Sequence, residues 1–344
     1  MRIGIVGLGA IGGTVAARLL ATRAAGEELQ LAAGSEKAAA LLRSRGLAVV
    51  EGEAGEGLLP IGCDAQAALP GGAPYSLVLL CVRSEATAGA LDAVLPLLAA
   101  DGAVVCLQNG LPEEAVAARA GAARTLGAVI GWSATQDEPG RYRVTGRGGF
   151  ELGALGSPAP PSLARAQALL ARAFPTSRID DLQSARWGKL AFNCAISTLG
   201  AVSGLSFGGL ARRRDARVLA LRCIGEVVAV ARAKGVRPAP VSGLRAQWLA
   251  DDGRRPSPIL RPLRHALFRL AASQRPRQRS GMLGRLLAGR TSGQIDDLNG
   301  AVVAQAAALG MEAPLNRALL DLVHAIERGE ERIAPEQLER LVAR

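Results

Sequence analysis

The chain has 344 residues, of which 49% are hydrophobic, 21% charged and 3% aromatic, and its formal net charge is +11. This length suits two domains, and the apolar fraction excludes an intrinsically disordered chain. The five cysteines form no C-x-x-C pair and there are only two histidines, which argues against a zinc site. No metal is therefore expected.

Most of the excess positive charge comes from one segment, residues 253–295, which contains arginines and no acidic residue. Its arginines are Arg254, Arg255, Arg261, Arg264, Arg269, Arg275, Arg277, Arg279, Arg285 and Arg290. Two interpretations stay open: a solvated basic surface, or a surface that attracts an anionic partner or a larger acidic substrate. Nucleic acid is not expected, because the segment has a single aromatic residue, Phe268, and no binding motif.

The first half of the chain alternates strand-like and helix-like segments, which predicts βαβ units and a parallel sheet. The expected strands are 2–6, 29–33, 77–82, 103–107 and 124–130, and the expected helices between them are 10–22, 37–45, 86–98 and 113–120. A glycine-punctuated stretch, 133–155, predicts antiparallel strands that close the sheet. A helix at 163–174 and a last strand at 177–179 complete this part.

From about residue 182 the pattern is helical almost throughout. We expect helices at 182–202, 216–234, 260–272, 292–309 and 316–328. In the fourth, the apolar residues recur at helical spacing: Ile295, Leu298, Val302, Ala306 and Leu309. No apolar stretch is long enough to cross a membrane, and the apolar N-terminus runs straight into a glycine motif, so we expect a cytoplasmic protein with no membrane partner.

That motif is Gly7-x-Gly9-x-x-Gly12, and it follows a strand and opens a helix as a dinucleotide-binding fingerprint requires. The first glycine permits the tight turn, the second lets the backbone approach a pyrophosphate, and the third allows close helix–sheet packing. The alternative is a glycine-rich turn in an ordinary α/β protein. The candidate cofactor-binding residues are Gly7, Leu8, Gly9, Ala10, Ile11 and Gly12.

The choice of cofactor depends on the end of the second strand. Glu36 could take the ribose hydroxyls of NADH or could simply begin the next helix, whereas Ser35 and Lys37 would suit the 2′-phosphate of NADPH. The residues favour NADPH, and NADH stays open.

Lys189, Asn193 and Ser197 are spaced four residues apart and fall on one helix face, while Phe192 and Ile196 belong to an apolar remainder. Such a polar stripe needs partners, either a bound substrate or internal hydrogen bonds. A lysine can protonate and stabilise the alkoxide formed when a ketone is reduced.

The two histidines are poorer candidates for this acid. Neither His265 nor His324 has an evident carboxylate to orient it.

Several motifs together resemble the ketopantoate reductase family over essentially the whole chain. They are GLGAIGG at the start, Gln108-Asn-Gly-Leu111, Trp187-x-Lys-Leu-x-x-Asn193, Ile295-Asp-Asp-Leu-Asn-Gly300 and Ala313-Pro-Leu-Asn-Arg317. The resemblance implies an N-terminal Rossmann domain, which we assign to residues 1–178. It also implies a helical domain of 6-phosphogluconate-dehydrogenase-like type, residues 179–344, and NADPH-dependent reduction of a 2-oxo acid to a 2-hydroxy acid.

Site residues follow from the resemblance position by position. Lys189 matches the family's general acid, and Asn109 matches an asparagine beside the nicotinamide that helps to hold the lysine. Asn193 matches a substrate-binding asparagine, and Ser280 approximately matches a serine that binds the substrate carboxylate.

The chain also departs from the family pattern. Gln294 stands where the family usually has a glutamate that bonds a substrate hydroxyl, and Ser197 replaces a second asparagine on the substrate side. Near the cofactor, Arg83 replaces a lysine after the fourth strand, and Gly34 replaces an arginine and so removes an NADP contact.

Gln294 has a second interpretation, because Thr291-x-x-Gln294 fits a capping box in which the glutamine bonds back to the cap residue. In either case a neutral amide replaces a carboxylate, which weakens one charge-assisted bond to substrate.

Three hypotheses therefore remain. The first is a reductase of 2-dehydropantoate to pantoate, the second a paralogue that reduces another carbonyl or an imine, and the third a non-catalytic dinucleotide sensor. The expected partner is a small-molecule 2-oxo acid, and a homodimer is left open.

Overall fold

The computed structural model describes residues 1–52, 56–251, 260–273 and 276–343. The chain divides into two compact units, Met1–Leu182 and Gln183–Arg344, and each is described by itself. Arg254, Arg255 and Arg275 of the arginine-rich segment lie outside the described residues.

The first unit is built on a mostly parallel sheet, as expected for a Rossmann domain. Within the described residues its eight strands follow the order β12-β11-β8-β7-β6-β1-β2-β5. The order runs outward in both directions from β1, which pairs in parallel with β2 on one side and with β6 on the other. The strands are β1 (Arg2–Val6), β2 (Glu28–Ala32), β5 (Ala65–Gln66), β6 (Tyr75–Leu80), β7 (Leu98–Cys106), β8 (Thr125–Ile130), β11 (Phe150–Ala154) and β12 (Thr176–Arg178).

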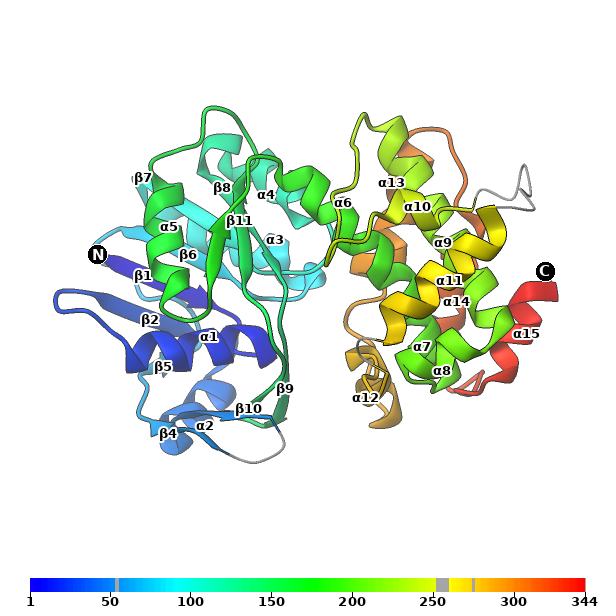
Figure 1. The fold of residues 1–344 in the computed structure, drawn as a ribbon. Helices are drawn as coiled ribbons and strands as arrows, with labels where there is room; N and C mark the ends of the chain where they lie inside the picture. The colour runs from blue at the N-terminus through cyan, green and yellow to red at the C-terminus, as the bar shows by residue number, and fades with distance from the viewer. Residues whose placement is uncertain (53–55, 252–259, 274–275, 344) are drawn as a thin grey trace. The chain divides into compact units, whose positions relative to one another are not determined.

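Helices cover both faces of this sheet (Figure 1). Alternate strand residues explain why: Leu77 and Leu79 of β6 join the core beneath α1 and α5, whereas Val78 and Leu80 join the core beneath α3 and α4. A strand buried on both faces is apolar at every position rather than at every second one, which the run 77–80 shows. The helices are α1 (Ala10–Ala21), α2 (Glu36–Arg45), α3 (Thr87–Val94), α4 (Pro112–Ala120) and α5 (Ser162–Ala171).

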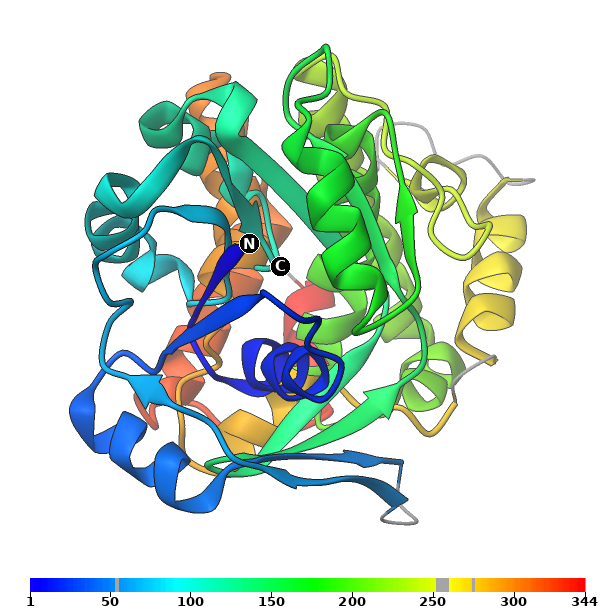
Figure 2. The ribbon, with the colours of Figure 1, turned by 90° about the vertical axis from the view of Figure 1, so that its left-hand side faces the viewer.

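A second sheet corrects the prediction for residues 133–155. Only β11 joins the main sheet there, antiparallel to β8. The other two strands, β9 (Ser133–Glu138) and β10 (Arg141–Gly146), combine with β3 (Leu47–Glu51) and β4 (Glu56–Ile61) in the order β4-β3-β10-β9. This sheet lies along the side of α1 away from the main sheet (Figure 2). Its β10 buries Tyr142 and Val144, two residues apart, against that helix.

The second unit is helical, and α9 packs against most of its other helices. Its helices are α6 (Leu182–Phe192), α7 (Thr198–Ser203), α8 (Phe207–Arg212), α9 (Arg214–Ala233), α10 (Ala246–Leu249), α11 (Leu260–Ser273), α12 (Gly281–Leu287), α13 (Ala301–Ala308), α14 (Pro314–Glu327) and α15 (Glu336–Ala343). The predicted fold class, a Rossmann domain followed by a helical domain, is confirmed.

Two predicted helices of this unit are interrupted by π-helical turns. The segment η4 (Asn193–Ser197) separates α6 from α7, and η5 (Asp296–Gly300) precedes α13. Ile295, Leu298, Val302 and Ala306 are buried as their spacing predicts, but Leu309 is exposed. It lies beyond the end of α13, where the helical repeat no longer directs it to the core.

Two features are absent from the residues that the structure describes. None of their helices has both the length and the apolar character needed to cross a bilayer. Nor do three or more of their His, Cys, Asp and Glu side chains gather where they could hold a metal ion.

The contact between α1 and β10 makes a testable prediction. A Cβ atom on Gly13 would collide with the ring of Tyr142, which is fully buried. We expect Gly13→Ala to lower the free energy of unfolding by about 1–3 kcal/mol, because the close-packed ring cannot move aside without strain. Denaturant unfolding measures the change.

Gly89 supplies a matched control, since it lies exposed in α3 and a Cβ there meets nothing within 4 Å. Gly89→Ala should leave stability unchanged or raise it by up to about 1 kcal/mol. Equal effects of the two substitutions would contradict the packing described for Gly13.

Candidate functional site

Four loops with predicted cofactor residues lie in a row along one edge of the main sheet. Parallel strands end at the same edge, and β2, β1, β6 and β7 are consecutive neighbours. Ser35 follows β2, the fingerprint follows β1, Arg83 follows β6, and Asn109 follows β7. The crevice outside the carboxyl ends of such strands, where the strand order reverses, is where open α/β sheets bind ligands.

The fingerprint turn has the geometry that its glycines require. Gly7 adopts φ +93°, and a Cβ atom there would lie 2.9 Å from the backbone of Cys81 and Val82. A Cβ on Gly12 would collide with the carbonyl oxygen of Gly7, so this glycine permits the close approach of α1 to the turn. Gly9, in contrast, has open space around its Cβ position.

Gly9 is also the N-cap residue of α1 and has no side chain to cap the helix. The first N–H groups of a helix have no partner within it and attract anions. The turn therefore fits the pyrophosphate of a dinucleotide, with Leu8, Ala10 and Ile11 supplying its backbone.

Tyr142 supports the same turn from the second sheet. Its hydroxyl donates a buried hydrogen bond of 2.9 Å to the carbonyl oxygen of Leu8. Burial raises the pKa of this tyrosine, so the hydroxyl keeps its proton and stays a donor. Sequence reasoning missed this residue, because its strand was expected in the main sheet.

The loop after β2 is shaped by Gly34 and Ser35. Gly34 adopts φ +83°, and its N–H donates to the carbonyl oxygen of Ala67 at 3.0 Å. Ser35 is the N-cap of α2, with its Oγ accepting from the N–H of Ala38 at 3.2 Å. The serine hydroxyl still has its own proton to donate. Glu36 forms an ion pair with Arg43, which supports its role as a first-turn residue of α2.

Arg83 and Asn109 occupy the next two loops. Arg83 directly follows Cys81 and Val82, the residues that approach Gly7. Its side chain is more than half exposed, and the guanidinium forms an ion pair of 3.0 Å with Glu85. Asn109 lies half-buried between β7 and α4.

In the helical unit, Lys189, Asn193 and Ser197 lie on one face of the α6–η4 helix. All three side chains are half-buried. In an α-helix residues four apart differ by about 40° around the axis. A π-turn closes its hydrogen bonds over five residues, and Asn193 and Ser197 are the first and last residues of η4.

Two apolar residues share this face, which corrects the sequence interpretation. Phe192 and Ile196 are half-buried like the polar residues, whereas Leu190, Ala191 and Cys194 are fully buried on the opposite side. The accessible stripe therefore alternates polar and apolar groups.

A buried polar network joins the two π-turns. The Nδ2 of Asn299, in η5, donates to the carbonyl oxygen of Cys194 in η4 at 3.3 Å. Its Oδ1 accepts from the hydroxyl of Thr198 at 2.7 Å. The same Nδ2 donates to Oδ1 of Asn316 at 2.9 Å, and the amide of Asn316 donates to Glu226 at 2.8 Å. Thr198, Asn299 and Asn316 are fully buried.

Asn299 and Asn316 come from motifs that carried the family resemblance, yet sequence reasoning gave them no role. The sequence did contain a signal for Asn299, because it follows Leu298 in a predicted helix whose buried positions are otherwise apolar. A polar residue at such a position must find internal partners.

Ser280 lies beside α7 and caps α12. A Cβ on Gly200 would lie 3.6 Å from the Cβ of Ser280, so the serine adjoins the helix that follows η4. Its Oγ accepts from the N–H of Met282 at 3.2 Å, and the residue is 6% exposed. The Ser280 hydroxyl can still donate its own proton to a ligand, but little of the residue is accessible to one.

Gln294 immediately precedes η5 and is half-buried. The capping interaction predicted for Thr291 is made one residue later instead. The Oγ of Ser292 accepts from the N–H of Ile295 at 3.3 Å, because the helix begins after Gln294 rather than before it. Gln294 is therefore not the third residue of the helix, as a capping box would need.

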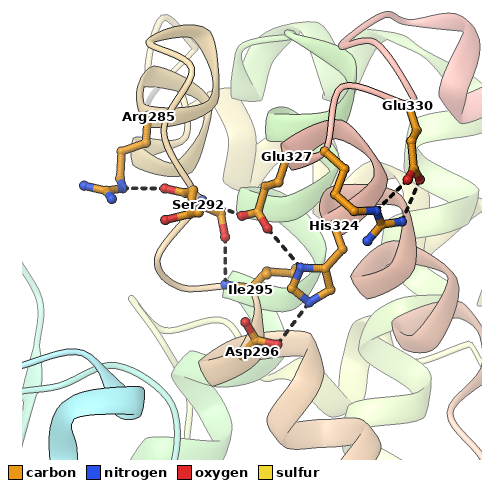
Figure 3. A network of polar contacts seen from close by, with 9 residues as sticks. Arg285, Ser292, Ile295, Asp296, His324, Glu327 and Glu330 are labelled. Atoms are coloured by element: carbon orange, nitrogen blue, oxygen red, sulfur yellow. Dashed lines mark hydrogen bonds and ion pairs between the residues drawn. The ribbon is translucent and has the colours of Figure 1, made fainter.

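The loop that carries Gln294 is tied to α14 by a network around His324 (Figure 3). Glu327 accepts from the N–H of Ser292 and contacts Nδ1 of His324 at 2.9 Å. Asp296 contacts Nε2 of the same ring at 3.1 Å. The expectation that His324 has no carboxylate to orient it was wrong, and Glu327 could have been found from its i+3 spacing. His265 instead accepts from Arg217 at 3.3 Å.

The two carboxylates govern the titration of His324. Partial burial acts to lower its pKa, but the hydrogen bonds and charges of Glu327 and Asp296 outweigh this, and the pKa is raised. Burial acts to raise the pKa of Glu327, and bonds from Ser292 and His324 outweigh it, so that pKa is lowered. The imidazole of His324 thus lies between two carboxylates, and both favour its protonated form.

Fold and site together define a two-domain, dinucleotide-dependent oxidoreductase. The family described as "Ketopantoate reductase PanE/ApbA" matches residues 3–157, and the one described as "Ketopantoate reductase PanE/ApbA C terminal" matches residues 181–327. The chain belongs to the ketopantoate reductase family, as its motifs predicted, and it is an oxidoreductase of the kind that acts on CH–OH groups.

Named relatives agree with this assignment. The chain is 28% identical to a 2-dehydropantoate 2-reductase of Mesorhizobium japonicum over 76% of this chain and 86% of the relative. It is 27% identical to the enzyme of that name from Pyrococcus horikoshii, over 95% and 98% of the two chains.

Solved structures share the fold. A PanE/ApbA family ketopantoate reductase from Ralstonia eutropha has a TM-score of 0.75 at 29% identity, covering 96% of this chain and 99% of that one. A D-mandelate dehydrogenase, solved with NADH and anilino(oxo)acetate, has a TM-score of 0.79 at 19% identity over the same shares. At that identity the second comparison is evidence for the fold alone.

The His324 network predicts a pH-dependent contribution to stability. Because the folded-state pKa is raised, the contribution is complete below the unfolded value of about 6.5 and is lost as the pH rises through the folded pKa. His324→Gln should lower the free energy of unfolding by up to about 1 kcal/mol at pH 6 and by less at pH 8.5. Urea unfolding of both proteins across this range measures the difference, and a constant difference would contradict the network.

Proposed function

We propose that this protein catalyses the NADPH-dependent reduction of a 2-oxo acid to a 2-hydroxy acid, with 2-dehydropantoate reduced to pantoate for pantothenate biosynthesis as the first substrate to consider. Membership of the family and the named relatives support the reaction class. The substrate and the preference for NADPH are inferred from this chain's own residues.

The accessible stripe on α6–η4 carries the proposal. It presents an ammonium group, Lys189, in line with Asn193 and Ser197 and flanked by Phe192 and Ile196. A small oxo acid needs both kinds of surface, since it has polar oxygens and, in ketopantoate, an apolar branch. A π-turn at such a position supports the proposal as well, because π-turns frequently occur at functional sites.

Lys189 is proposed to act as the general acid. As the carbonyl carbon is reduced, negative charge develops on the carbonyl oxygen, and the lysine ammonium stabilises that charge and then delivers a proton to it. Asn193 and Ser197 would orient the substrate by hydrogen bonds, Ser280 would bind its carboxylate, and Gln294 would take a hydroxyl.

The fingerprint turn, Ser35 and Arg83 would hold the dinucleotide, and Asn109 would lie beside the nicotinamide. When bound, the reduced nicotinamide supplies the hydride. The residues fit this cofactor because the space at Gly9 is open, the N-terminus of α1 has no side-chain cap, and the turn is set by Gly7 and Gly12.

A second candidate function is reduction of a different carbonyl or an imine by the same machinery. Gln294 and Ser197 favour it, since both replace groups that the family uses on the substrate side. The limited access to the Ser280 hydroxyl also favours it.

The test that separates the two candidates is NADPH oxidation with 2-dehydropantoate and a panel of other 2-oxo acids. Strong turnover of 2-dehydropantoate would support the first candidate. Turnover of another substrate alone would support the second, and tight cofactor binding without any turnover would overturn both in favour of a dinucleotide sensor.

Lys189→Ala should lower kcat by at least about 10²-fold, the usual contribution of a general acid, and leave the Kd for NADPH within about twofold. Lys234→Ala is the matched control. That lysine lies at the C-terminal end of α9, outside the accessible stripe, and donates to the side chain of Gln305 in α13. Steady-state kinetics and fluorescence titration give the two readouts. Unchanged turnover of Lys189→Ala would exclude the proposed acid.

Ser35 allows a sharp test of cofactor preference. Ser35→Asp keeps an N-cap for α2 but places a negative charge where we expect the 2′-phosphate, so KM for NADPH should rise on the order of tenfold and KM for NADH should change little. Ser35→Asn preserves the cap without the charge and should behave nearly as wild type. An equal rise of KM for both cofactors would place Ser35 outside the 2′-phosphate site.

A further inference from the structure

A basic hollow on the helical unit is lined by residues of α9, α11 and α15. Its volume is 510 Å³, and its lining residues are Arg213, Arg214, Asp215, Val218, Arg261 and Val342. A smaller hollow of 240 Å³ adjoins it and is lined by Arg214, Arg261, Pro262 and His265. Arg214 and Arg261 are common to both, so they stand at the junction of the two hollows.

The acidic groups at this place are already engaged by one arginine. Arg213 binds the carboxylate of Asp215 through Nη2 at 2.6 Å and that of Glu339 at 2.8 Å. Arg214 and Arg261 are exposed, and within the described residues neither has an acidic partner. The lining therefore carries a surplus of positive charge that an anion would neutralise.

A pair of contacting residues, the buried Arg217 and the half-buried His265, adds a hydrogen-bond donor. Arg217 is 6% exposed; its Nη1 donates to backbone carbonyls at the end of α8, and its Nε donates to Nδ1 of His265. Since Nδ1 accepts this bond, the ring proton of neutral His265 is on Nε2. Burial lowers the pKa of His265, and the surrounding arginines lower it further, which keeps the ring neutral.

The start of α9 lies at the larger hollow. This helix has 20 residues, and Arg213, Arg214 and Asp215 at its N-terminus line the larger hollow. The N-terminal end of a helix carries a partial positive charge that stabilises anions. At this terminus the carboxylate of Asp215 already accepts from the N–H of Ala216 at 2.7 Å, so the preference for a ligand anion rests on the arginines and His265.

The lining is also partly apolar. Val218 and Val342 line the larger hollow and Pro262 the smaller one, next to the charged groups. A fully hydrated inorganic ion would gain nothing from these side chains, whereas an anion attached to an organic group would cover them.

We propose that the two adjoining hollows form one binding site for a phosphate ester of a small organic molecule, with the phosphate held by Arg214, Arg261 and the Nε2–H of His265. Two guanidinium groups and an imidazole N–H offer more donors than the two oxygens of one carboxylate can use, whereas a phosphate has three terminal oxygens. The site also assigns a role to one member of the arginine-rich segment, Arg261. It is independent of the proposed reaction.

The probe is phenyl phosphate, titrated into the full chain by calorimetry, with benzoate as the carboxylate of the same apolar group. We expect phenyl phosphate to bind at one site and benzoate at least about tenfold more weakly. Arg214→Gln/Arg261→Gln should weaken phenyl phosphate binding at least about tenfold. Both side chains are exposed, so the variant should fold, and circular dichroism checks this.

Two controls make the result specific. Arg237→Gln/Arg332→Gln removes the same charge from exposed positions elsewhere in the unit and should leave the affinity within about twofold of wild type. Gly9→Ala narrows the fingerprint site, where a phosphate could also bind, and should leave the affinity unchanged. The proposal is overturned if phenyl phosphate does not bind, if both arginine pairs matter equally, if benzoate binds as well, or if only Gly9→Ala abolishes binding.

Discussion

The amide group of Asn299 is the constraint on which the helical unit's site depends. It is fully buried and bonds the backbone of one π-turn, the hydroxyl that follows that turn, and a second buried asparagine. A buried amide that loses its partners costs about 1–3 kcal/mol per lost bond, so the network has few alternative arrangements. The turn that carries Asn193 and Ser197 and the turn that follows Gln294 are thereby held in fixed positions relative to each other.

The proposed cofactor site at the edge of the main sheet is held in place by neighbouring residues in a similar way. Gly7 and Gly12 approach each other so closely that no side chain fits between them, and Tyr142 reaches across from a second sheet to hold the carbonyl of Leu8. In each unit the groups proposed to meet a ligand are thus fixed by neighbours that do not touch it. Precise placement of reacting groups requires such support.

Much of this could be predicted from the sequence, for identifiable reasons. The fingerprint turn depends on steric rules that act over a few residues, so its glycines and the flanking strand and helix were evident. The stripe of Lys189, Asn193 and Ser197 followed from helical spacing. The place of β9 and β10 in a separate sheet could not be predicted, because it depends on which side of α1 Tyr142 packs against, a contact between residues about 130 apart in the chain.

The π-turns were missed for a related reason. A single inserted residue in a helix barely changes the apolar periodicity. The π-turns here are joined to partners on distant helices, Asn316 and Glu226, which local sequence does not reveal. The cap at Ser292 differed from the prediction by one residue because the helix start is set by Glu327 and His324 of α14. Tertiary contacts, not local propensity, decided each of these features.

The central claim is direct transfer of a hydride to the carbonyl carbon of a 2-oxo acid, and isotope transfer tests it most directly. NADPH carrying deuterium at nicotinamide C4, labelled on one face and then on the other, is incubated with enzyme and 2-dehydropantoate, and the product is analysed by mass spectrometry. The account predicts a 2-hydroxy acid with one deuterium at C2 from one label and none from the other. A product without deuterium from either label would contradict it.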